Sequence, residues 1–200
     1  IVVNGRTWPF LEVEQRRYRF RFLNGCNSRF VILKLSNGLP FWQIGAEGGF
    51  LPAPVELEQL LMGPAERADV IVDFTNVSVG TEIILRNLGP DEPYGGGEPD
   101  VDFPLPDPDT TGQVMQFRVS ASTAPDPSTP AEFLALPAIA PLPPETRVRR
   151  LALLEHMHSL GEGGPTAALL GSVDADPADG PAGTTHLMWM DPVTENPSLG

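Results

Sequence analysis

Apolar and polar residues alternate with a period of two in several short stretches of the chain. The clearest stretch is residues 17–22, in which arginines alternate with Tyr18, Phe20 and Phe22. Successive side chains of a β-strand point to opposite sides of the sheet. This pattern therefore predicts a strand with one aromatic face and one basic face.

Two further apolar runs predict strands that are more deeply buried. Residues 30–35 are almost wholly apolar, which predicts a strand covered on both sides. Residues 68–74 place Val70 and Val72 on one face of a strand and Ile71, between two aspartates, on the other.

The remaining strand candidates are also short, and turn signals lie between them. The dipeptides Asn24-Gly25 and Asn37-Gly38 predict turns. The 23 prolines and 20 glycines also disfavour a helical bundle. The sequence therefore predicts an all-β fold, an antiparallel sandwich or barrel. The further strand candidates are residues 40–49, 55–62, 81–88, 113–120 and 147–157.

Two stretches do not follow this pattern of short strands and turns. Residues 88–112 are rich in Gly, Pro and Asp, and such a long connection predicts either a surface excursion with a role or a mobile loop. Residues 121–146 are rich in Pro and Ala, which predicts an extended, polyproline-like chain wrapping the surface.

Length and charge narrow the class of protein. Two hundred residues allow one large domain or two small ones. The net charge is −13, and all of the excess lies after residue 87, because residues 1–87 carry equal numbers of acidic and basic side chains. An acidic chain disfavours nucleic acid and anionic membrane as partners, and no apolar run is long enough to span a membrane.

Both ends of the sequence resemble cut ends. The chain opens with "IVVNG", without a methionine or a signal peptide, and closes with the linker-like "DPVTENPSLG". We therefore expect a longer parent protein, whose targeting signal this sequence does not reveal.

His156 and His158 are the only closely spaced histidines. In a strand they share a face and can both point at one ion. A blue-copper centre also needs a thiolate, and the single cysteine, Cys26, has no histidine near it in the sequence; His186 is isolated. We interpret the pair as ordinary strand residues, and a small metal-binding protein built on them stays an alternative.

Other candidates for chemistry have simpler explanations. Cys26 is interpreted as a small, buried thiol rather than a nucleophile. The glycines of "IGAEGGF" lack the spacing of a phosphate-binding loop and predict a turn. The acidic residues of the long loop show no calcium-binding pattern and predict a solvated surface. The glycines are Gly45, Gly48 and Gly49, and the acidic residues are Asp100, Asp102, Asp107 and Asp109.

Glu66 and Arg67 stand where a predicted strand begins. A guanidinium presents a planar fork of donors that can join two chain segments through carbonyls or a carboxylate. We interpret Arg67 as an internal clamp, with a substrate anchor as the alternative.

Several stretches together resemble one family. "VNGRTWPFLEVEQRRYRFRFLNGCNSRF" and "LSNGLPFWQIGAEGGFLPAPVELEQLLMGPAERADVIVDF" resemble the middle cupredoxin-like domain of bacterial multicopper oxidases of the spore-coat laccase and bilirubin oxidase type. "VMQFRV" resembles the closing strand, and "MWMDPVTENP" the connection to a third domain. The resemblance is dense over residues 1–87 and returns at 113–119 and 185–197.

The resemblance implies a cupredoxin-like Greek-key β-sandwich that has no copper of its own. We expect a domain at residues 1–190 and the start of a linker, at 191–200, to a missing third domain. It further implies that the parent, extracytoplasmic, secreted or spore-associated, oxidises phenols, aromatic amines, bilirubin-like pigments or metal ions with copper and reduces dioxygen to water. Catalytic, cofactor-binding and metal-binding residues are all expected to be absent from this segment, which is predicted to be inactive in isolation.

In that interpretation the segment is a scaffold whose partners are the flanking cupredoxin domains. Its uncovered faces also predict possible self-association of the isolated segment. Two departures from the family are visible: Glu47 stands where aspartate is expected, and residues 88–112 contain no cysteine for the disulfide that some relatives have there. A free-standing interaction module of the same fold stays an alternative.

Overall fold

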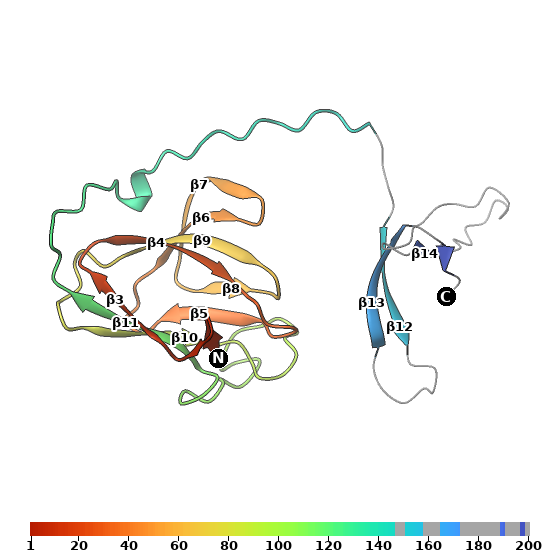
Figure 1. Ribbon diagram of the computed structural model, residues 1–200, viewed down its shortest axis with the longest axis horizontal. Coiled ribbons are helices and arrows are strands. Elements are labelled where there is room, and N and C mark those ends of the chain that lie inside the picture. The colour runs from red at the N-terminus through yellow and green to blue at the C-terminus, as the bar shows by residue number, and fades with distance from the viewer. Residues whose placement is uncertain (147–150, 158–164, 173–188, 191–196, 199–200) are drawn as a thin grey trace. The chain divides into compact units, whose positions relative to one another are not determined.

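The computed structural model describes residues 1–146, 151–157, 165–172, 189–190 and 197–198, with side chains described up to residue 146 (Figure 1). The chain forms two compact units, Ile1–Ala140 and Pro141–Gly200. The elements of the first unit are β1 (Val2–Val3), β2 (Arg6–Thr7), β3 (Phe10–Glu14), β4 (Arg17–Leu23), β5 (Val31–Leu35), β6 (Phe41–Ala46), β7 (Gly49–Leu57), β8 (Leu60–Met62), β9 (Arg67–Asp73), β10 (Glu82–Asn87), β11 (Gln113–Ser120) and the 3₁₀ turn η1 (Ala131–Phe133).

Two sheets make up most of the first unit. One has the strand order β3-β11-β10-β5-β8, in which β3 and β11 are parallel and the other neighbours antiparallel. The second sheet, β4-β9-β6-β7, is antiparallel throughout. β1 and β2 form a small separate hairpin.

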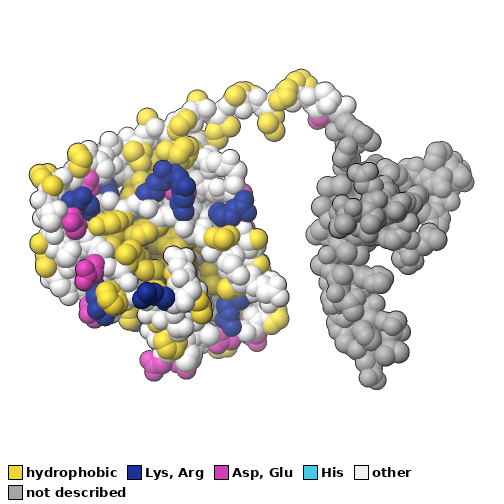
Figure 2. Space-filling model, viewed as in Figure 1, with side chains coloured by type: hydrophobic (Ala, Val, Ile, Leu, Met, Phe, Trp, Pro, Cys, Tyr) yellow, Lys and Arg dark blue, Asp and Glu magenta, His cyan; other side chains and the backbone are white. Residues whose placement is uncertain are grey.

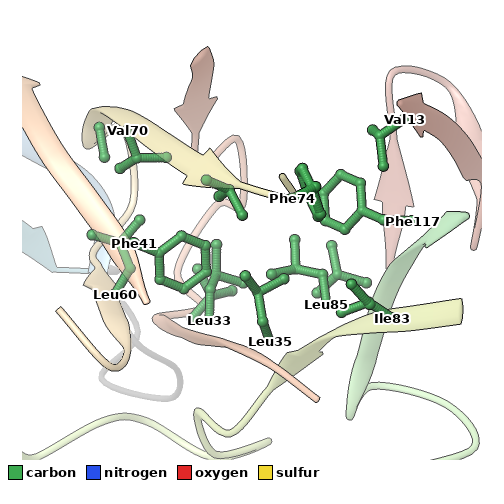
Figure 3. Close-up of a cluster of buried hydrophobic side chains, with 14 of the residues drawn as sticks. Val13, Leu33, Leu35, Phe41, Leu60, Val70, Phe74, Ile83, Leu85 and Phe117 are labelled. Carbon is green, nitrogen blue, oxygen red and sulfur yellow. The ribbon is translucent and has the colours of Figure 1, made fainter. Parts of the chain in front are cut away.

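The core lies between the inner faces of the two sheets (Figure 3). Phe117 of β11 meets Phe20 of β4, with ring centroids 5.3 Å apart, and also meets Phe74, which follows β9. Val70 and Val72 of β9 point into this core, as the period-two pattern predicts. Burial of these large apolar side chains supplies the main driving force for the sandwich.

The long loop 88–112 covers the outer face of β5. Tyr94 packs between Phe30 and Phe103, with ring centroids 5.1 and 5.7 Å apart, and Phe103 is buried. Ile32, on the outward side of β5, is buried as well. The predicted two-sided burial of this strand is therefore confirmed, and the loop is a packed surface excursion.

The Pro- and Ala-rich tract covers part of the outer face of the second sheet (Figure 1). Ala131 of η1 packs with Ile44 of β6 and Ile71 of β9 in a second, smaller core, and Leu134 joins it. The tract follows the surface as predicted, but it is held by apolar contacts and is interrupted by one 3₁₀ turn.

The described residues of the second unit form two strand pairs. β12 (Leu151–Met157) is antiparallel to β13 (Pro165–Ser172), and β14 (Trp189–Met190) is antiparallel to β15 (Pro197–Ser198). The all-β, cupredoxin-like class predicted from the sequence is confirmed, since helix is limited to one 3₁₀ turn in the described part of the chain. One domain at residues 1–190, with a linker after it, stays a prediction.

Candidate functional site

The first unit has an open groove of about 950 Å³ between the two sheets. Its floor is formed by core residues of the five-stranded sheet, among them Leu33 of β5, Leu85 of β10 and Phe117 of β11. Phe20 and Phe22 of β4 form one wall, and Phe10 and Leu11 of β3 lie along another. Figure 2 shows apolar side chains in the hollow between the sheets, with Lys and Arg side chains around it.

The groove leaves core-facing side chains partly uncovered. Leu11 and Val13 lie two residues apart on β3 and so share a face of the sheet. Val13 is 0% exposed, whereas Leu11, which lines the groove, is 40% exposed. Phe20 and Phe22 point at the core and are only half-buried. The sandwich is therefore closed at Val13 and open along the groove.

Basic groups surround this apolar opening. Arg6, Arg21 and Arg29 line it, and its lining includes no acidic side chain. Arg29 is paired with Asp91, at 2.6 Å, whereas the side chain of Arg21 is 78% exposed and 3.9 Å from Asp69. The rim therefore favours a ligand or segment that carries negative charge.

Cys26 stands at the edge of the groove, where its amide donates to Oδ1 of Asn24 over 3.0 Å. The sequence predicted a buried thiol, but Cys26 is half-buried because the groove beside it is open. All three histidines of the sequence lie beyond residue 155, so the first unit offers no imidazole base to this thiol.

The remaining sequence candidates of the first unit have structural roles. Gly45 lies at a register shift between β6 and its neighbours, where a Cβ would stand 3.0 Å from the carbonyl oxygen of Gly49. Asp102 accepts a hydrogen bond from the amide of Glu98, at 2.7 Å, and Asp107 from that of Asp109, at 2.9 Å. These contacts stabilise turns within the long loop.

Arg67 forms the clamp predicted for it, although on the surface rather than inside. Its guanidinium donates to the carbonyl oxygens of Ala65, at 2.9 Å, and Glu47, at 3.2 Å, and pairs with the Glu47 carboxylate. The start of β9 is thereby joined to the turn between β6 and β7. Glu47, the departure from the family pattern, supplies both a carbonyl and a carboxylate to this contact.

The histidine pair lies in the second unit. His156 belongs to β12, where its backbone pairs with Ala167, whereas His158 and His186 lie outside the described residues. Within the described part of the chain, no three His, Cys, Asp or Glu side chains form a group that could hold a metal ion. The expectation of a copper-free segment stays a prediction.

Sequence reasoning missed three polar anchors. The buried Asn24 and Asn87 hold the backbone at the ends of connections, and Asp126 attaches the Pro- and Ala-rich tract to β4. A local signal existed for Asp126, because Asp-x-Ser favours a turn in which the carboxylate accepts the amide of Ser128. No local signal marked Asn87, whose partners come from three chain segments.

Comparison with known proteins gives a consistent family. The chain is 38% identical over its full length to a laccase of Bacillus subtilis and covers 34% of that protein. It is 36% identical to the bilirubin oxidase of Albifimbria verrucaria, with 88% of this chain and 29% of that protein covered. No family model matches the chain.

Solved structures agree. The 2F4 variant of the McoA multicopper oxidase from the hyperthermophile Aquifex aeolicus superposes with a TM-score of 0.59 and 32% identity, over 86% of this chain and 33% of that one. The chain spans about one third of the length of the curated relatives it matches. The resemblance predicted from the sequence is confirmed: along its whole length, the chain is homologous to a one-third segment of the multicopper oxidases, the proteins that include laccases and bilirubin oxidase.

Proposed function

We propose that the chain is the copper-free middle part of a laccase-like multicopper oxidase and acts as a scaffold between copper-bearing flanking domains. The observation that carries this proposal is the similarity over the full chain to about one third of each oxidase. The parent protein would oxidise phenolic, aromatic-amine, bilirubin-like or metal-ion substrates and reduce dioxygen to water. As an exported enzyme, it would work outside the cytoplasm.

The packing of the first unit supports a scaffolding role. Metal and electron-transfer sites require ligands held to within a fraction of an ångström, so the elements between them must be rigid. Here both irregular stretches are fixed to the sheets, the loop 88–112 through Tyr94 and Phe103 and the tract through Ala131 and Asp126. Closely packed segments of this kind are hardly compressible, so they would hold neighbouring domains at a fixed spacing.

The described residues do not fit a copper centre. Imidazole, thiolate and thioether groups are the side chains that bind copper in proteins. Cys26 is the only thiol of the chain, and residues 1–140 contain no histidine. No step of the redox chemistry is therefore assigned to this chain. Its own contribution would be the spacing and angle of its neighbours.

Copper titration of the 200-residue chain tests the proposal. We expect weak, non-stoichiometric Cu(II) binding by calorimetry, no oxygen uptake with a phenolic substrate, and the same titration curve for His158→Ala and for the matched variant His186→Ala. Tight, stoichiometric binding that His158→Ala abolishes would instead support a small metal-binding protein.

The complete gene product provides a second test of the proposed function. We expect it to contain copper by elemental analysis and to consume oxygen with the same phenol. A complete product that folds but holds no copper contradicts the proposed function and favours an interaction module.

A further inference from the structure

The groove and the free edge of β4 lie side by side. β4 is the terminal strand of its sheet and pairs only with β9 among the described strands. The Phe74 amide donates to the Arg16 carbonyl at one end of this pairing, and the Asn24 amide donates to the Glu66 carbonyl at the other. Hydrogen-bonded pairs recur every second residue in antiparallel strands. The amides and carbonyls of Arg19, Arg21 and Leu23 therefore point away from β9.

One position of this edge already has an acceptor. The amide of Arg17 points away from β9 in the same way, and it donates to Oδ2 of Asp126 over 2.8 Å. Beyond it, the amides of Arg19, Arg21 and Leu23 have no hydrogen-bond partner in the described part of the chain. Unpaired strand edges are templates for a further strand.

Exposure beside this edge points to the same missing element. The core-facing Phe20 and Phe22 are half-buried, whereas Phe41, Phe74 and Phe117 of the same core are fully buried. Leu11, which lines the groove, is 40% exposed. A strand placed along β4 would send every second side chain into the groove, over these residues. Its other side chains would lie beside Arg19 and Arg21.

We propose that one extended strand of the parent polypeptide, from outside these 200 residues, pairs with β4 and closes the groove. This inference rests on the proposed function, in that about two thirds of each relative's length lies beyond the matched segment. The strand has apolar residues at alternate positions, which fill the groove, and acidic or neutral polar residues between them, which suit the basic rim. A second copy of this chain fits less well, because pairing β4 with β4 would bring Arg17, Arg19 and Arg21 of both copies together.

Hydrogen exchange of single amides is the direct test. In the 200-residue chain, the amides of Arg19, Arg21 and Leu23 should exchange at least tenfold faster than those of Phe20 and Phe22, which face β9. In the complete gene product, the three outward amides should slow by tenfold or more. Fast exchange at Arg19 and Arg21 in the complete product overturns the proposal. Protection of these amides in the 200-residue chain that increases with protein concentration also overturns it, because it indicates pairing between two copies.

A peptide added to the 200-residue chain tests the chemistry of the occupant. The probe is a synthetic peptide of about nine residues, long enough to pair with all of β4, with valine alternating with glutamate and threonine. A control peptide has the same composition but groups its valines, which removes the apolar face. We expect the alternating peptide to protect Arg19, Arg21 and Leu23 and the control peptide not to do so.

Two variants test whether the peptide binds in the groove. Leu11→Asp puts a charge on the groove wall and should weaken binding of the alternating peptide about tenfold. Val79→Asp changes an exposed apolar residue away from the groove and should leave binding unchanged. Equal binding of both variants, or equal protection by both peptides, overturns the proposal. A complete product without copper but with protected Arg19 and Arg21 would refute the proposed function alone.

Discussion

Two buried asparagines hold the backbone where regular pairing stops. Asn24 donates from Nδ2 to the carbonyls of Arg29 and Met62, at 2.8 and 3.1 Å. Asn87 accepts from the amides of Ile32 and Gly89 and donates to the carbonyls of Gly89 and Thr111, over 2.9–3.3 Å. Backbone groups buried without partners are costly, so each side chain replaces a missing strand contact.

Asn87→Ala should therefore be strongly destabilising. Asn87 is 1% exposed, and removal of its side chain leaves four backbone groups without their partner, three of them in buried contacts. We expect a loss of about 3 kcal/mol in the free energy of unfolding, measured by urea denaturation. The control Asn37→Ala removes one exposed contact, to the amide of Leu39, and should cost less than about 0.5 kcal/mol. Equal losses for the two variants would contradict this role for Asn87.

Among the elements, the sheets were predictable, whereas the contacts made by the segments that cover them were not. The alternation in β4 and β9 and the apolar run of β5 sufficed to predict which faces turn inward. Ile71 was placed on the outer face of β9 between two aspartates, yet it is buried, because Ala131 and Leu134 cover it from sixty residues away. Contacts between residues sixty positions apart produce no repeating pattern in a sequence. The open groove produces none either, because residues of both sheets form it.

Gly45 is needed where β6 changes register. A Cβ there would stand 3.0 Å from the Gly49 carbonyl oxygen and 3.1 Å from Cβ of Asp69, and backbone atoms cannot move aside cheaply. Gly45→Ala should cost about 1–3 kcal/mol in the free energy of unfolding. Gly48 lies in the turn that follows β6, with nothing within 4 Å of its Cβ position, so Gly48→Ala should change stability by less than about 0.5 kcal/mol. Thermal denaturation of the two variants, followed by circular dichroism, measures the contrast.

At the scale of the molecule, the sandwich depends on attachments between segments far apart in the chain. Asp126 attaches the tract to β4: its carboxylate accepts from the amides of Arg17 and Ser128, at 2.8 and 2.9 Å. The guanidinium of Arg17 joins the same site, donating to Asp73 and to the carbonyl of Ser128. The hydrogen bonds that the Asp126 carboxylate accepts, that from the Arg17 amide foremost, lower the pKa of Asp126 from 3.8 to about 2.

A lowered pKa makes the attachment sensitive to acid. Because the folded protein holds Asp126 ionised more strongly than the unfolded chain does, its stabilisation is complete well above pH 3.8 and disappears as the pH falls towards 2. The difference in unfolding free energy between the native chain and Asp126→Asn should thus be constant from pH 7 to about 5 and shrink below about 4.

Urea denaturation at a series of pH values measures this difference. Trp42 packs against the smaller core that Ala131 forms with Ile44 and Ile71, so its fluorescence supplies a local signal for detachment of the tract. The control Asp109→Asn changes an exposed carboxylate of the long loop, away from the tract, and should leave the Trp42 signal for detachment unchanged. A difference for Asp126→Asn that persists undiminished at pH 2.5 would mean that the carboxylate acts by shape alone. The tract would then be held by the apolar contacts of Ala131 and Leu134, without help from the ionised group.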